Sequence, residues 1–384
     1  MIALLRSTRW EFSVLRIVLL VAVGWWILRA TNMVQAQLPV SEEWPRTDFS
    51  KTLVDLQEIT SGGPPKDGIP SIDSPRFESP EKAARWLDLR EPVVAVVIGE
   101  QARAYPLQIL IWHEIVNDEF AGVPLSVTFC PLCNATLVFD RRLGKRILDF
   151  GTTGRLRKSD MVMYDRQTES WWQQFTGRGI VGEMAGVELK RLPASIVSFE
   201  DFRRAYPQSP VLSRKTGYSR GYGRNPYRGY DRVGDRPFLF RDPVDPRLPA
   251  MERVLNVTVG ERHTIFPFSA LRAQPVVNET VGGMPVAVFS RDGMLSVLDA
   301  ENIADSRAVP AATAFQRHLD GQTLNFRLDG PKIIDVETGT RWDLLGRAID
   351  GPLKGQQLQP TDSGVHFAFA WLAFRPDSAI YRAP

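Results

Sequence analysis

Short stretches of alternating apolar and polar residues dominate the chain, and they predict mostly β-strands. Residues 92–98 are an apolar, β-branched run, and Gly99 and Glu100 then make a hairpin turn into residues 102–105. Across residues 107–115 the apolar positions are instead three and four apart, which predicts a helix with one buried face. Ser79 and Pro80 predict the start of a short helix at 80–87, and Ser198 predicts the cap of a closing helix that runs to Tyr206. Together these patterns predict an α+β protein that is rich in strands.

The pattern of the first strands and helix occurs a second time. Residues 97–107 align with residues 258–268 at an offset of 161 positions. Identities at this offset are Gly99 with Gly260, Pro106 with Pro267, Leu110 with Leu271 and Asn117 with Asn278. Further along, residues 165–172 parallel residues 335–342 at an offset of 170 and share Asp, Thr and Trp. We therefore expect two tandem copies of a related mixed strand/helix domain.

Composition sets the boundaries of the two copies. A Pro- and Gly-rich approach segment covers residues 37–85, and the first repeat domain, which holds the Cys-x-x-Cys pair, covers residues 86–212. The second, Cys-less repeat domain covers residues 251–384, and an Arg-, Tyr- and Gly-rich linker at 213–250 joins the two. We expect the linker to be ordered, with its tyrosine rings in contact with the flanking domains.

The first 36 residues have the features of a targeting segment. Basic residues precede an uncharged apolar run at 17–28, and small residues then suit cleavage after Ala36. The run is short for a membrane span, which needs about 20 residues. We expect a signal peptide at 1–36 and an exported protein, periplasmic or extracellular, with an uncleaved membrane anchor at 17–28 as the alternative.

Charge excludes one class of partner. Removing residues 1–36 removes four arginines and one glutamate, which leaves the rest of the chain with balanced charge. Arginine interleaved with tyrosine in the linker can bind RNA, but export argues against it. We therefore expect no nucleic acid partner, and membrane contact only through the N-terminal segment.

The most distinctive chemistry lies in Cys130-Pro131-Leu132-Cys133, which contains the only two cysteines. Apolar alternation on both sides predicts a turn between two strands. Two sulfurs on such a turn can form a disulfide, exchange one, or bind a soft metal. A thioredoxin-type pair begins a helix, and that context is missing here, so the turn is more similar to a metal knuckle. The second copy has residues 288–293, which contain no cysteine, where the first has the turn, and Gln274 at the position of His113. We therefore expect the chemistry in the first copy.

Three functions remain open for this turn. In the first, Cys130 and Cys133 bind copper or zinc together with imidazoles from His113 and His366. In the second, the pair is a thiol–disulfide redox couple in which His113 lowers a thiol pKa and Cys130 attacks. In the third, the protein is a non-enzymatic binding or structural module held by a Cys130–Cys133 disulfide, although so short a loop gains little stability.

A separate polar site is a further candidate for acid–base chemistry. It contains Asp160, Asp165 and Arg166. Asp165 is matched by Asp335 in the second copy, which favours a turn or cap role for it. The sequence has no phosphate loop, nucleophile elbow or dinucleotide fingerprint, and its motifs do not decide whether the protein is an enzyme.

Three motifs together resemble the domain-of-unknown-function 3179 family of bacterial and archaeal proteins. They are the Trp-His-Glu-Ile-Val-Asn-Asp stretch at 112–118, the turn at 130–133 and the stretch at 159–168. The resemblance covers roughly residues 64–384. It implies an uncharacterised protein and no particular activity.

Overall fold

The computed structural model describes residues 40–383, so the predicted signal peptide or anchor lies outside the described residues. The chain divides into two units, residues 1–47 and residues 48–384. The first unit contributes one short described helix, α2 (Val40–Glu43). Between residues 40 and 383, no helix combines the length and the apolar character needed to cross a bilayer.

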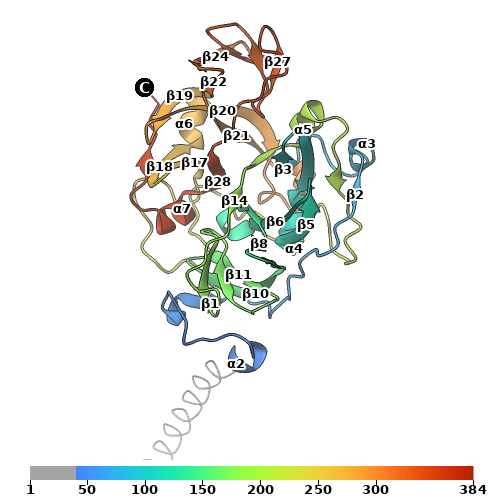
Figure 1. Cartoon of the computed structure of the whole chain (residues 1–384), viewed down its shortest axis with the longest axis vertical. Coiled ribbons are helices and arrows are strands. Elements are labelled where there is room, and N and C mark those ends of the chain that lie inside the picture. The colour runs from blue at the N-terminus through green and yellow to red at the C-terminus, as the bar shows by residue number, and fades with distance from the viewer. Residues whose placement is uncertain (1–39, 384) are drawn as a thin grey trace, which may run out of the picture. The chain divides into compact units, whose positions relative to one another are not determined.

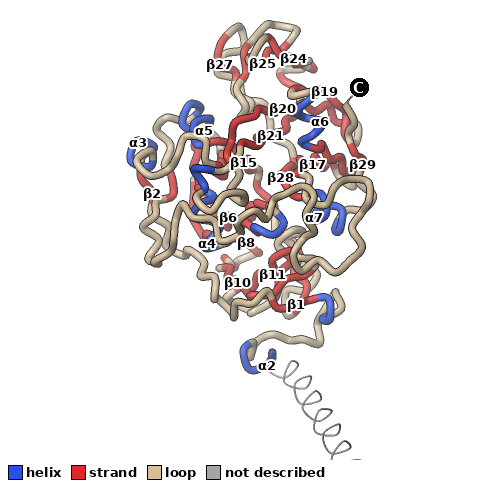
Figure 2. Tube along the Cα trace, turned by 180° about the vertical axis from the view of Figure 1, so that it is seen from behind, coloured by secondary structure: helices blue, strands red, loops and turns tan. Residues whose placement is uncertain are grey.

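The second unit consists mainly of strands, with short helices between them (Figure 1, Figure 2). The α-helices are one or two turns long: α3 (Pro80–Ala83), α4 (Leu107–His113), α5 (Phe199–Ala205), α6 (Phe268–Ala273) and α7 (Ala368–Phe374). The unit also contains three 3₁₀ turns: η1 (Leu56–Glu58), η2 (Pro131–Cys133) and η3 (Ile303–Asp305). The predicted β-rich fold is confirmed.

Three sheets contain most strands of residues 48–212, which we call the front half. The first has the order β15 (Ala194–Ser198), β3 (Pro92–Ile98), β4 (Gln101–Pro106), β16 (Val211–Leu212), β2 (Phe77–Glu78). The second has the order β14 (Arg191–Leu192), β7 (Ala135–Asp140), β6 (Val123–Cys130), β5 (Ile115–Phe120). The third has the order β1 (Ile59–Ser61), β10 (Phe150–Arg157), β11 (Asp160–Asp165), β12 (Trp171–Gln173), β13 (Arg178–Val181). A separate hairpin pairs β8 (Arg142–Leu143) with β9 (Arg146–Ile147).

The strands of residues 251–383, which we call the back half, also form three main sheets. The first has the order β28 (Asp362–Phe367), β17 (Arg253–Val259), β18 (Arg262–Pro267), β29 (Ala379–Ile380). The second has the order β19 (Val276–Val281), β20 (Met284–Leu295), β21 (Ala308–Gln316). The third has the order β24 (Phe326–Asp329), β25 (Lys332–Asp335), β26 (Arg341–Trp342), β27 (Ala348–Asp350). A separate hairpin pairs β22 (His318–Leu319) with β23 (Gln322–Thr323).

Local sequence explains the elements that lead to the cysteine turn. The β-branched residues of β3 are almost entirely buried, and Gly99 has φ 59° in the turn to β4, a conformation that glycine adopts at little cost. Helix α4 buries the apolar face that its spacing predicts. It ends at His113, two residues earlier than expected, because Glu114 is left-handed (φ 58°) and Ile115 begins β5.

The helices α3 and α5 test two further predictions. Ser198 caps α5, since its hydroxyl oxygen accepts a 3.1 Å hydrogen bond from the Asp201 backbone N–H. The predicted closing helix is therefore confirmed. Helix α3 is shorter than expected, and the side chain of Ser79 makes no capping hydrogen bond to it.

The same element order occurs in both halves: β3–β4–α4–β5–β6 in the front and β17–β18–α6–β19–β20 in the back. Individual contacts recur with it. Asn117 exchanges two hydrogen bonds with the backbone of Phe150 (2.8 and 3.1 Å), and Asn278 does the same with Phe326 (2.7 and 2.8 Å). Such bonds satisfy backbone groups that would otherwise be buried unpaired.

Asp165 and Asp335 also make matching contacts. Asp165 accepts hydrogen bonds from the backbone and hydroxyl of Thr168 (2.6 and 2.9 Å) and from the Trp172 indole (2.9 Å). Asp335 accepts the corresponding bonds from Thr338 (2.6 and 2.8 Å) and from the indole of Trp342 (2.9 Å). The turn-capping role expected for Asp165 is confirmed.

The linker is ordered against both halves. The Tyr222 hydroxyl lies 2.7 Å from the imidazole of His113, and the Tyr230 hydroxyl donates to the Leu132 carbonyl at 3.0 Å. The Tyr230 ring also packs edge-on against Phe367 of the back half. The predicted tyrosine contacts are therefore confirmed for these two residues, while the domain boundaries stay a prediction.

Candidate metal centre

The two cysteines lie where strand β6 ends and β7 begins. Cys130 is the last residue of β6, and η2 carries Cys133 back toward Ala135, which pairs with Cys130 across the hairpin. Asn134 closes the turn with φ 48°, a left-handed conformation that asparagine tolerates better than most residues. Both cysteines are buried free thiols, so the structure contradicts the predicted Cys130–Cys133 disulfide. Instead of facing each other in a bond, the thiols share one acceptor.

That acceptor is the carbonyl of Ser159, in the turn between β10 and β11. The Cys133 sulfur lies 3.4 Å from this oxygen and the Cys130 sulfur 3.9 Å. Lys158 and Ser159 both have positive φ, 53° and 64°, which is costly for residues with a side chain. This strained two-residue turn brings the Ser159 carbonyl and Asp160 beside the sulfurs.

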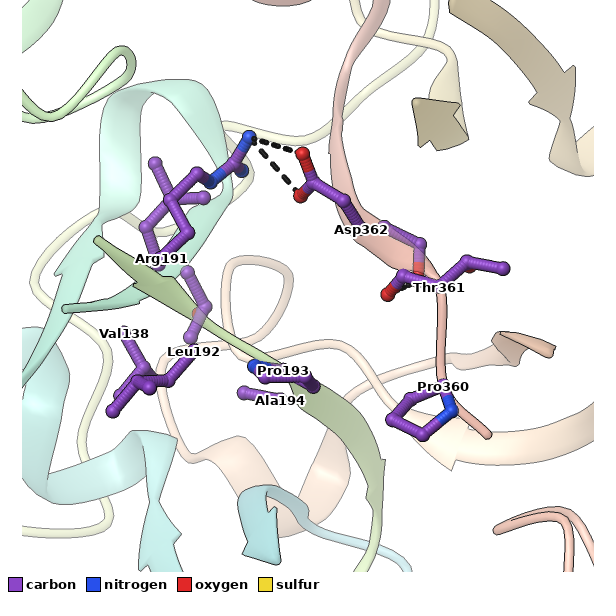
Figure 3. Close-up of a pocket in the computed structure, with 11 residues that line it drawn as sticks. Val138, Arg191, Leu192, Pro193, Ala194, Pro360, Thr361 and Asp362 are labelled. Carbon is purple, nitrogen blue, oxygen red and sulfur yellow. Dashed lines mark hydrogen bonds and ion pairs between the residues drawn. The ribbon is translucent and has the colours of Figure 1, made fainter. Parts of the chain in front are cut away.

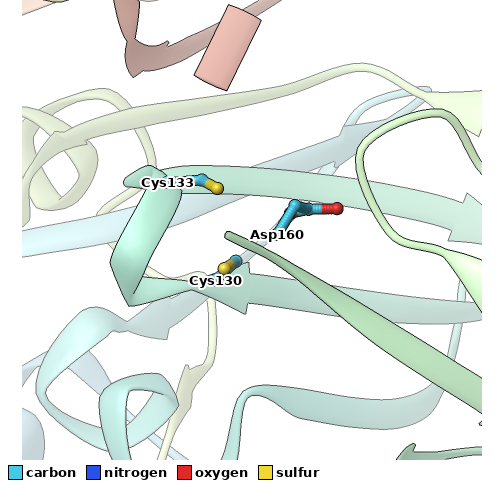
Figure 4. Close-up of side chains that lie close together, drawn as sticks. All are labelled: Cys130, Cys133 and Asp160. Carbon is cyan, nitrogen blue, oxygen red and sulfur yellow. The ribbon is translucent and has the colours of Figure 1, made fainter. Parts of the chain in front are cut away.

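Asp160 completes a three-residue group with the cysteines (Figure 4). One ligand atom from each of the three side chains lies within 4.8 Å of the other two, and all three residues are buried. The Oδ2 atom of Asp160 accepts hydrogen bonds from Gln173 Nε2 (2.6 Å) and the backbone N–H of Phe175 (2.9 Å). Its Oδ1 atom has no hydrogen-bond partner among the described residues.

Burial favours the uncharged forms of the acids in this region. Burial raises the pKa of Asp160 to about 7, against hydrogen bonds that lower it. Burial raises the pKa of the Glu114 carboxyl to about 8, and the charge of Asp160 adds to the rise. Burial raises the pKa of Cys130 and raises that of Cys133 well above its usual value. The largest influences on the pKa values of these four groups include no cationic side chain of the described residues.

Linker tyrosines lie beside the same group. Burial raises the pKa of Tyr227, and the charges of Glu114 and Cys130 add to the effect. Burial likewise raises the pKa of Tyr230, and the charge of Cys133 is the second largest cause of the rise. The Ser159 hydroxyl donates to the carbonyl of Phe238 at 2.6 Å. Residues 227–238 therefore cover both turns that carry the candidate ligands.

The structure gives His113 other partners. Its Nδ1 atom lies 2.7 Å from the Pro70 carbonyl, which can only accept, so Nδ1 carries the proton. Its Nε2 atom lies 2.7 Å from the Tyr222 hydroxyl and accepts from it. Burial lowers the pKa of His113 to about 4, which keeps the ring neutral. His113 is absent from the group formed by the two cysteines and Asp160, and both of its ring nitrogens already make hydrogen bonds.

His366 is also outside the group. Its Nε2 atom lies 3.1 Å from Asn256 Oδ1, while Nδ1 has no hydrogen-bond partner among the described residues. The ring packs against Phe175 and stacks on Trp371, with centroids 4.8 and 5.4 Å apart. Burial lowers the pKa of His366 well below its usual value. The environment is that of a packed core histidine.

The polar site predicted at Asp160, Asp165 and Arg166 is divided among different contacts. Asp165 caps its own turn, and Arg166 bonds to Asp67 (3.0 Å) and to the Tyr164 hydroxyl (2.9 Å). Only Asp160 joins the cysteines. The sequence held a sign that Asp160 belongs with the cysteines. At the offset of 170 its position in the back half is Gly330, so Asp160, like the cysteines, has no counterpart there.

The fold and site define a β-rich protein with a buried Cys/Cys/Asp group beneath a tyrosine-bearing linker. Residues 66–378 match the protein family of unknown function DUF3179, and the chain belongs to this family. No curated protein and no solved structure matches the chain.

Proposed function

We propose that Cys130, Cys133 and Asp160 bind one soft or borderline metal ion, and that zinc fits the donor set best. The convergence of three buried acidic side chains carries the proposal: one ligand atom from each lies within 4.8 Å of the other two, and burial is the largest influence on the pKa of each. Buried acids must either keep their protons or pair with a positive charge. A metal ion between them supplies that charge.

The donor atoms narrow the choice of metal. Zinc accepts thiolate sulfur and carboxylate oxygen together, commonly in tetrahedral sites. Copper(I) prefers soft sulfur ligands and makes little use of a carboxylate. Glu114 is the candidate for a fourth ligand, because it is buried and its charge acts on the pKa of Cys130. Its left-handed backbone is a second sign of strain in the region, and such strain gathers at functional sites.

The hydrogen bonds of Asp160 support the same function. Gln173 and Phe175 hold its Oδ2 atom, which fixes the carboxylate and leaves Oδ1 for an ion. Binding would displace the thiol protons, since thiolate is the ligand form. The raised thiol pKa values favour metal binding over thiol–disulfide exchange. Exchange needs a free thiolate, which burial disfavours, whereas a bound metal ion itself stabilises the thiolate.

Elemental analysis of the purified protein tests the proposal. We expect about one zinc ion per chain in protein prepared without chelator, and loss of that ion in Cys130→Ser, Cys133→Ser and Asp160→Asn. Asp343→Asn is the matched control, because burial also raises the pKa of this aspartate and it lies in the back half. Cobalt substitution gives a second readout, since sulfur–cobalt charge-transfer absorption requires bound thiolate. Metal-free wild type that also fails to take up added zinc or copper would overturn the proposal.

We also propose that the protein is exported, and that its two halves arose by duplication of one unit. The basic and apolar pattern of residues 1–36 supports export. The matching contacts of Asn117 with Asn278 and of Asp165 with Asp335 support duplication. Detection of the chain in the periplasm or medium, with a new N-terminus after Ala36, would test the first point.

A further inference from the structure

Two neighbouring cavities lie where the front and back halves meet. One has a volume of about 210 Å³ and is lined by β7, by the β14–β15 connection and by the start of β28 (Figure 3). The other has a volume of about 350 Å³ and reaches toward Phe175 and Trp371. Arg191 and Asp362 line both. The Arg191–Asp362 ion pair therefore stands between the two cavities.

Arg191 is held loosely in this pair. Its Nη1 atom lies 3.3 Å from Asp362 Oδ1 and 3.5 Å from Oδ2, longer than the 2.7–2.9 Å of a good charge-assisted bond. Only 25 % of the Arg191 side chain is exposed, against 42 % of Asp362. The Nε and Nη2 groups donate to no partner among the described residues, so one edge of the guanidinium is open. Burial lowers the pKa of Arg191, and the nearby charge of Arg375 adds to this.

Thr136 also lines the smaller cavity, but its hydroxyl is buried beneath the wall and has no hydrogen-bond partner among the described residues. A ligand in the cavity therefore does not reach this hydroxyl. The rest of the wall is mostly apolar: Leu137, Val138, Leu192, Pro193, Ala194 and Pro360. Recognition of an anionic group in this cavity therefore depends on Arg191.

We propose that the smaller cavity binds the carboxylate of a small organic acid, with the open edge of Arg191 as the donor and the apolar wall against the rest of the molecule. The inference goes beyond metal binding and does not rest on it. An arginine fork matches a carboxylate in two parallel hydrogen bonds. The volume equals that of about seven water molecules, which suits a short-chain acid.

Asp362 acts in this site as an internal competitor. It occupies Arg191 when no ligand is bound, and a ligand carboxylate takes part of that role. The only charged side chains lining the smaller cavity are Arg191 and Asp362. A cationic ligand would meet the guanidinium at close range, and an uncharged one would leave its open donors unsatisfied. This selects an anion with an apolar portion.

Calorimetric titration of the full chain with propionate, succinate and propionamide tests the inference. Propionamide matches propionate in shape but carries no charge. We expect saturable binding of the two carboxylates and at least tenfold weaker binding of the amide. Equal binding of propionate and propionamide, or binding of neither carboxylate, overturns the proposal.

Two variants and one control sharpen the result. Arg191→Gln should weaken propionate binding about tenfold or more. Asp362→Asn should tighten binding, because it frees Arg191, whereas a merely structural ion pair predicts no gain. Arg204→Gln, which breaks an exposed pair with Glu200, should change nothing. If Arg191→Gln does not fold, Asp362→Asn decides: unchanged or weaker propionate binding in that variant contradicts the proposal.

Discussion

The front and back halves make the same folding contacts but differ in their chemistry. Asn117 and Asn278 bridge strands in the same way, and Asp165 and Asp335 cap matching turns. In the front half the chain turns sharply at Cys130–Cys133, between β6 and β7. At the corresponding point of the back half, β20 continues to Leu295 and pairs with β21, with an irregularity between Arg291 and Met294.

This difference separates the residues that the fold needs from those that it does not need. The back half folds with Arg291, Met294 and Gly330 at the positions of Cys130, Cys133 and Asp160. The three front-half acids are thus not needed for the contacts that the two halves share. Their presence in a buried place, with strained backbone around them, supports the metal site that we propose.

The largest effect that we expect is stabilisation by zinc, confined to the front-half group. A ligand present at about a thousandfold its Kd stabilises the folded state by about 4 kcal/mol. Wild type should gain this free energy of unfolding when zinc is added to chelator-treated protein, as measured by denaturant unfolding. Cys130→Ser with Cys133→Ser should gain nothing. Arg291→Ala in the back half is the control and should respond like wild type; a zinc response in the double cysteine variant would place the site elsewhere.

The next effect tests the contacts that the halves share. Asp165→Ala and Asp335→Ala each leave a buried indole N–H and a backbone N–H without an acceptor. Each should lower the free energy of unfolding by about 3 kcal/mol, and by similar amounts. Asp329→Ala, at an exposed position of β24, should have little effect. Markedly unequal losses would show that the two turns do not serve the same role.

A smaller effect concerns pH in the metal-free protein. The folded-state pKa of Asp160 is raised to about 7, above the usual value near 4, so at pH 5 to 7 the unfolded chain releases a proton that the folded chain keeps. Stability should therefore fall as pH rises through this range, by about 1 kcal/mol per pH unit.

Urea unfolding at several pH values measures this slope. Asp160→Asn should make the slope shallower without abolishing it, because Glu114, with a folded-state pKa of about 8, adds a slope of the same sign. Asp343→Asn should change the slope less, because the rise in pKa there is smaller. Saturating zinc should also make the slope shallower, since a bound Asp160 no longer holds the proton. An unchanged slope in Asp160→Asn would contradict the inferred protonation of Asp160.

The smallest effect concerns the linker. Its Tyr230 contacts the cysteine turn of the front half. Tyr230→Phe removes the hydrogen bonds between its hydroxyl and Leu132 and Phe238, and should cost about 1 kcal/mol of unfolding free energy. Tyr218→Phe, an exposed change in the same linker, should cost nothing measurable in thermal unfolding. Equal losses in the two variants would deny the Tyr230 hydroxyl any special role.

The sequence predicted what depends on local pattern. The strands beside the cysteines, the helix after Tyr105 and the cap at Ser198 follow from residues close together in the chain. Asp160 was assigned to a different site because it lies 27 positions beyond Cys133, and only the packing of the β10–β11 hairpin brings it to the sulfurs.

His113 shows how contacts with distant residues escape the sequence. Its place near the cysteines in sequence suggested a ligand or base, but helix α4 directs the ring to Pro70 and to Tyr222 of the linker. Neither partner is within forty residues of it, so no spacing rule identifies them. Burial of both cysteines as free thiols likewise depends on the acceptor at Ser159 and could not be read from the Cys-x-x-Cys spacing.

The hydrogen bond from the Tyr230 hydroxyl to the Leu132 carbonyl joins segments that are synthesised at different times. A chain synthesised as far as residue 212 already contains both cysteines and Asp160, but not the segment that later closes over them. During that interval residues 227–238 do not yet cover the two turns. An ion bound as we propose would therefore reach the sulfurs most easily before that segment closes, and later exchange would have to wait for the segment to detach.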